Sequence, residues 1–170
     1  MDEVEQLMHA FYSFQGPSAT AWKLDTVLGL SALHDSRVFA FLVRLLSDNR
    51  ESPDVRLDVL TRLRALDLNP VERALVASTM VDVLGRDVDA RLRLNAALAL
   101  GDFIEAEHVV DRLGTVVLSE RESFDLRYAA FSSLERAGPI AAVVAVFEQL
   151  TSDDLLGPSA VSMLQTWHRS

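Results

Sequence analysis

The segment DVDARLRLNAALALGDF, residues 87–103, decides the fold because apolar residues surround most of the helix that it would form. Leucine and alanine dominate from Leu92 to Leu100, although Asp89, Arg91 and Arg93 lie in the same segment. A surface helix that packs against one neighbour needs only one apolar stripe. We therefore expect this helix to have neighbours on several sides.

The pattern of this segment returns along the chain at nearly regular intervals. Each copy has an apolar residue, a basic residue, a small or β-branched residue three positions later and a leucine seven positions later. The basic residues are Lys23, Arg56, Arg93 and Arg127, and Gly157 takes their place in a fifth, degenerate copy. Consecutive copies are 33, 37, 34 and 30 residues apart. Such self-similarity is typical of a helical repeat protein.

A second set of apolar segments lies between these copies, with spacings of three and four that predict helices. They cover residues 4–14, 38–46, 71–84, 109–118 and 140–150. Proline is tolerated in the first turn of a helix, and all five prolines fall at expected helix starts. Asn69–Glu72 and Ser119–Glu122 each have the residues of a capping box. The sequence therefore predicts an all-α chain of ten helices in five hairpins.

The repeats resemble HEAT repeats, which are the paired-helix units of α-solenoids. In that family the second helix commonly has an acidic residue three positions before an apolar-Arg pair, then small residues, then Leu-Gly. Asp89, Leu92-Arg93, Ala96 and Leu100-Gly101 match this motif. The resemblance implies a right-handed α-α superhelix, and the length of the chain predicts one domain over residues 1–170. Its repeats would span about 1–34, 35–67, 68–103, 104–137 and 138–170.

Within each copy, positions are numbered from the basic residue as zero. At about 100° per residue, positions −1, +3, +4 and +7 centre the core stripe. This stripe includes Trp22 at position −1 of the first copy. The +7 leucines should share one environment; they are Leu30, Leu63, Leu100 and Leu134.

Composition restricts the functional classes. The 170 residues carry a formal net charge of −9, which disfavours nucleic acid as a partner because such binding depends on neutralising phosphates. The chain has no cysteine and no apolar run of the roughly 20 residues that span a bilayer. We therefore expect a cytoplasmic protein that does not bind membranes.

No constellation of residues points to catalysis. The histidines lack paired-ligand spacing, and neither a nucleophile elbow nor a phosphate-binding glycine loop is present. The sequence predicts no cofactor, no metal and no enzymatic activity. The basic series at position zero has two interpretations: arginines that hold the stack together, which we favour, or a ladder that binds phosphate.

The candidate binding residues lie one and five positions after the basic residue, where a HEAT helix is usually polar. Position +1 points away from the centre of the core stripe by roughly 135°. These residues either form an apolar ridge that binds a partner or pack against the adjacent repeat. They are Leu24, Leu57, Leu94 and Tyr128 at +1, with Leu28 and Leu98 at +5.

The favoured hypothesis is a non-catalytic scaffold, adaptor or inhibitor that binds another protein through its second helices. Neither the identity of that partner nor the oligomeric state follows from the sequence. The alternative is an enzyme on a HEAT-like scaffold, resembling either the phycobilin lyases or the HEAT-like DNA glycosylases. Its candidate residues would be Trp22 and Trp167, with Asp25, Asp58 or Asp102 as acids.

Overall fold

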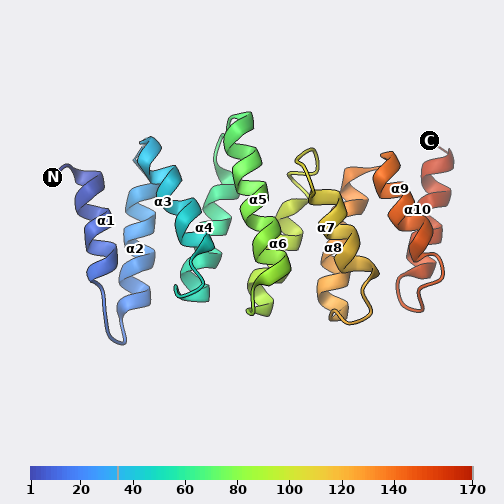
Figure 1. Cartoon of the computed structure of the whole chain (residues 1–170), viewed down its shortest axis with the longest axis horizontal. Helices are drawn as coiled ribbons and strands as arrows, with labels where there is room; N and C mark the ends of the chain where they lie inside the picture. Colours follow the sequence, from blue (N-terminus) through green and yellow to red (C-terminus); the bar gives the residue numbers. More distant parts are fainter. Residues whose placement is uncertain (34, 170) are drawn as a thin grey trace. The chain divides into compact units, whose positions relative to one another are not determined.

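The computed structural model describes residues 1–33 and 35–169, and the described chain contains ten α-helices and no strand (Figure 1). The predicted repeat ends at residues 34 and 170 lie outside the described residues. The helices are α1 Glu3–Ser13, α2 Ala19–Ser31, α3 Ser36–Ser47, α4 Pro53–Ala65, α5 Pro70–Arg86, α6 Ala90–Leu100, α7 Val109–Leu118, α8 Phe124–Ala137, α9 Ala141–Leu150 and α10 Gly157–Arg169. The predicted all-α class and the five helical hairpins are confirmed.

The helices begin where the sequence provides side-chain caps. Asn69 and Glu72 form the predicted capping box at the start of α5. The predicted box at Ser119–Glu122 is wrong, because α8 begins four residues later with Ser123 as its N-cap. Ser52 and Asp89 are the N-caps of α4 and α6, and each side chain accepts a hydrogen bond from the amide three residues later. Serine and aspartate are therefore interchangeable as N-caps at this repeat position.

The chain forms two compact units, Met1–Leu68 and Asn69–Ser170. In the first unit, α1 pairs with α2, α3 pairs with α4, and α2 also packs along α4. The core contains the rings of Phe11 and Phe41, whose centroids lie 5.4 Å apart at right angles. The unit ends close to residue 67, where the second predicted repeat ends. Its organisation with the rest of the chain as one domain stays a prediction.

The second unit contains three hairpins in two layers. The first helices α5, α7 and α9 follow one another, and the second helices α6 and α8 pack side by side. The Ser133 hydroxyl of α8 donates a hydrogen bond to the Ala97 carbonyl of α6 at 2.7 Å. Gly114 of α7 leaves room for Val146 of α9, since a Cβ there would lie 3.0 Å from a Val146 methyl. Side-chain and backbone contacts thus join each hairpin to the next.

Four of the five +7 leucines occupy equivalent places in their hairpins, and the fifth, Leu164, is half-buried. Leu30, Leu63, Leu100 and Leu134 are each fully buried. Trp22 was expected in the core, and this prediction is wrong because its side chain is 55% exposed. Phe14 stacks on its indole, with ring centroids 5.9 Å apart. The right-handed superhelical course remains a prediction.

None of the described helices combines the length and the apolar character that crossing a membrane requires.

Candidate partner-binding surface

The three arginines at position zero, Arg56, Arg93 and Arg127, each connect the two helices of their hairpin. The Arg56 guanidinium donates to the Leu46 carbonyl at 2.8 and 2.9 Å, at the end of α3. Arg93 and Arg127 reach the carbonyls of Leu84 and Val117 in the same way, at 2.8 and 2.9 Å. A cation at a helix C-terminus satisfies orphan carbonyls and interacts favourably with the helix dipole. The structural interpretation of the arginines is confirmed.

The same basic residues connect a hairpin to the next one. Lys23 pairs with Glu51 at 2.7 Å, and Arg93 binds both carboxylate oxygens of Glu122 at 2.6 and 2.8 Å. Arg127 pairs with Asp153. Each acid lies in the connection between the two helices of the following hairpin. These bonds hold consecutive hairpins in register. They explain why an acidic residue recurs in the connection between the two helices of a hairpin.

The ion pairs shift the pKa values of their acids. Hydrogen bonds from the Arg93 guanidinium lower the pKa of Glu122, although partial burial opposes the shift. Burial alone would raise the pKa of Asp153. The amide of Leu156, the Arg127 guanidinium and the amide of Leu155 outweigh that effect, so the pKa of Asp153 is lowered. Both carboxylates are therefore charged at neutral pH.

The six predicted binding residues fall into two patches, one in each unit. The first patch is Leu24 and Leu28 on α2 with Leu57 on the neighbouring α4; the second patch is Leu94 and Leu98 on α6 with Tyr128 on the neighbouring α8. Leu28 is 56% exposed and Tyr128 is 54% exposed. The other four are half-buried, and none belongs to the buried core.

The packing of α8 explains the half-burial in the second patch. Ser133 approaches the carbonyls of Ala97 and Leu98, so α8 borders the side of α6 that carries Leu98 and, one turn earlier, Leu94. Tyr128 occupies the equivalent place on α8 but is open, because α10 has little backbone contact with α8. Packing against the next second helix therefore accounts for part of the burial of the leucines, and it contributes less at Tyr128.

Phe124 extends the second patch, although the sequence did not predict it as a binding residue. Phe124 is 48% exposed and stacks on Tyr128 one turn later, with ring centroids 6.0 Å apart. An aromatic pair at i and i+4 on one helix face is readable from sequence. Phe124 occupies position −3 of its copy, and a comparison of the copies does not reveal it, because none of the others has a large apolar residue at that position.

Most of the candidate residues of the enzyme alternative make contacts that stabilise the fold. Asp58 binds Arg62 one turn later at 2.6 Å, and Asp102 pairs with Arg136 at 3.4 Å. Trp167 packs on Phe147 with centroids 4.9 Å apart. Asp25 lies exposed on α2. The described residues contain no group of three or more potential metal-ligating His, Asp or Glu side chains.

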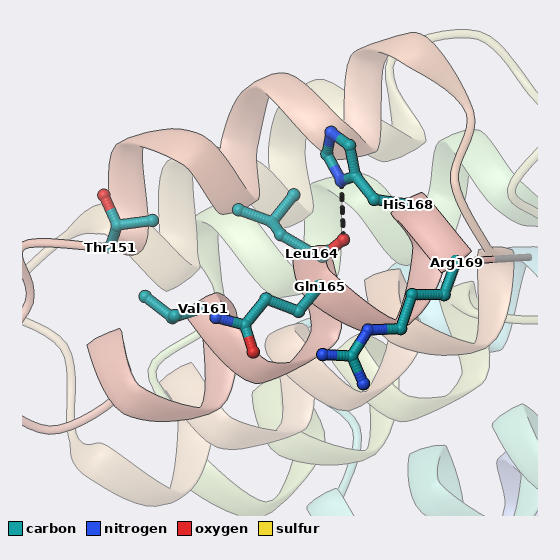
Figure 2. A pocket seen from close by; sticks show the side chains of 6 residues that line it. All are labelled: Thr151, Val161, Leu164, Gln165, His168 and Arg169. Carbon is teal, nitrogen blue, oxygen red and sulfur yellow. Dashed lines mark hydrogen bonds between the residues drawn. The ribbon is translucent and has the colours of Figure 1, made fainter.

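Two surface hollows lie away from these patches. One, of about 320 Å³, follows one side of α10 and is lined mainly by apolar atoms; Figure 2 shows Val161 and Leu164 in it, with the His168 Nδ1 held 2.7 Å from the Leu164 carbonyl. The other, of about 550 Å³, has a mixed polar and apolar lining that includes Tyr12 and Arg44. Neither hollow includes an acid of the enzyme alternative.

Comparison of the chain with models of protein families and with the sequences of curated proteins found no match.

Proposed function

We propose that this chain is a HEAT-like helical repeat protein that binds another protein through its second helices and catalyses no reaction. The observation that supports it is the exposure of large apolar side chains at repeated positions. Leu28 on α2 of the first unit and Tyr128 on α8 of the second unit are each more than half exposed. Exposed apolar patches on a well-packed protein are typical of partner surfaces.

The charges favour a protein partner over a nucleic acid. Arg56 and Arg127 are buried and bound to helix ends, and Arg93 is engaged by Glu122. They are therefore not available to neutralise phosphates, and the chain as a whole carries −9. A cytoplasmic location is part of the proposal, since a cysteine-free chain suits a reducing compartment.

Single charged substitutions test the two patches. Leu28→Arg and Tyr128→Arg should each weaken partner binding by at least about tenfold, because a guanidinium replaces an apolar anchor. Val71→Arg is the matched control, since Val71 is also an exposed apolar residue but lies on the first helix α5. Each variant is immobilised, and proteins captured from the native host are quantified by mass spectrometry.

Support requires a captured protein that the Val71→Arg variant retains and at least one patch variant loses. Thermal melting of each variant controls for folding. Retention of every captured protein by both patch variants, with unchanged melting, contradicts the proposal.

A further inference from the structure

Five aromatic rings form a continuous row through the second unit. This aromatic row comprises Phe124, Tyr128 and Phe131 on α8, Phe147 on α9 and Trp167 on α10, with successive ring centroids 6.0, 6.3, 4.7 and 4.9 Å apart. Its outer end, at Phe124 and Tyr128, is exposed. Its middle rings, Phe131 and Phe147, are buried. Trp167 is the α10 ring that lies against Phe147.

The helix that supplies Trp167 is weakly anchored. Of its 13 residues, α10 fully buries only Gly157 and Ala160, both of them small and at its N-terminal end. By contrast, α8 buries seven of its 14 residues. The larger apolar residues Met163, Leu164 and Trp167 are only half-buried. Few buried apolar contacts place a segment at the low-stability end of a fold.

The segment before α10 is fixed, in contrast to the helix itself. Asp153 accepts hydrogen bonds from the amides of Leu155 and Leu156 at 3.0 and 2.8 Å and pairs with Arg127 of α8. The Leu156 side chain is buried. The connection is therefore tied to the rest of the unit, while α10 beyond Ala160 depends on its packing along α9.

From this arrangement we propose that α10 is a lid over Phe147 in the aromatic row. The lid opens without unfolding of α5–α9 and uncovers Phe147. Phe147 then becomes a second exposed aromatic site in this unit, beyond the exposed rings of Phe124 and Tyr128. The opening itself follows from the packing of α10, and its regulatory consequence rests on the proposed function: the closed lid limits the surface that a partner of the second patch can contact.

Native-state hydrogen exchange tests the opening and needs no partner. Amides of residues 161–166 in α10 should exchange at least about 100-fold faster than those of residues 144–150 in α9, through an opening that low urea accelerates less than it accelerates global unfolding, because the opening exposes less surface. Trp167→Ala should speed exchange in α10 about tenfold further and leave α5–α8 unchanged. Gln165→Ala is the control, because Gln165 is exposed on the same helix.

The dye 8-anilinonaphthalene-1-sulfonate reports the uncovered aromatic surface. Trp167→Ala should bind several-fold more dye than wild type, whereas Gln165→Ala should match wild type. Equal exchange in α9 and α10, an effect of Trp167→Ala on α5–α8 as large as that on α10, or unchanged dye binding would each overturn the lid. Because these readouts use the isolated chain, their failure is separate from a failure of the docking proposal.

Discussion

At the scale of single residues, Gly157 shows why one repeat departs from the pattern. The other copies have lysine or arginine at this position, but a Cβ at Gly157 would lie 2.8 Å from the Thr151 carbonyl oxygen and 3.3 Å from that of Leu150. The start of α10 therefore packs directly on the backbone that follows α9. Direct backbone packing stands in place of the bond that Arg56, Arg93 and Arg127 make to a helix end in the three preceding hairpins.

Gly157→Ala should accordingly lower the free energy of unfolding by about 1–3 kcal/mol, because the carbonyls it meets are backbone atoms that cannot move aside. Gly29→Ala is the control, since its Cβ would meet only a Leu7 methyl at 3.8 Å. Replacing glycine inside a helix should there stabilise the protein by up to about 1 kcal/mol. Urea unfolding followed by circular dichroism measures both, and equal effects of the two variants would contradict this account.

At the scale of elements, the helix starts show what a local motif can and cannot predict. Asn69 and Glu72 lie three residues apart in the sequence and bond to each other's backbone amides in the fold, so the capping box was correctly predicted. Ser119 and Glu122 have the same spacing, but Glu122 binds Arg93, which lies 29 residues earlier. A local pattern cannot reveal a competing partner from another hairpin, and the stronger charged pair decides the structure.

The pair between Arg93 and Glu122 predicts a pH dependence of stability. The ordinary pKa of the carboxyl is 4.5 and folding lowers it, so the pair contributes its full stabilisation above pH 4.5. That stabilisation is lost as the pH falls from 4.5 through the lowered pKa of folded Glu122. Glu122→Gln should cost about 1 kcal/mol at pH 7, since the pair is only partly exposed.

The difference between wild type and Glu122→Gln should shrink as the pH falls from 4.5 through the lowered pKa of folded Glu122, because a protonated glutamate resembles glutamine. Urea unfolding of both proteins at pH 7, 5, 4 and 3 measures it. Glu120→Gln is the control, because Glu120 is exposed two residues away. A difference that stays constant with pH would show that Glu122 acts through shape and not through charge.

At the scale of the whole molecule, periodicity predicted the fold better than the candidate site. Leu30, Leu63, Leu100 and Leu134 are fully buried, as helix geometry and the pairing of the two helices predict, whereas Leu164 at position +7 of the last hairpin is half-buried. The exposure of Leu94, Leu98 and Tyr128 depends instead on how closely the next second helix approaches. The second helix α8 packs closely on α6, whereas α10 has little contact with α8, and the period of the sequence does not predict this difference.

The division into two units leads to a prediction about the smallest piece that folds. Residues 69–170 contain three hairpins, and a cut before Asn69 preserves the capping box of α5. Because each hairpin buries its apolar face only against its neighbours, stability requires several stacked hairpins. The fragment 69–170 should therefore show helical circular dichroism and a cooperative urea transition, whereas the single hairpin 138–170 should show neither. A helical, cooperatively unfolding 138–170 peptide would mean that its two helices need no neighbour, which is incompatible with a stack whose stability comes from the contacts between hairpins.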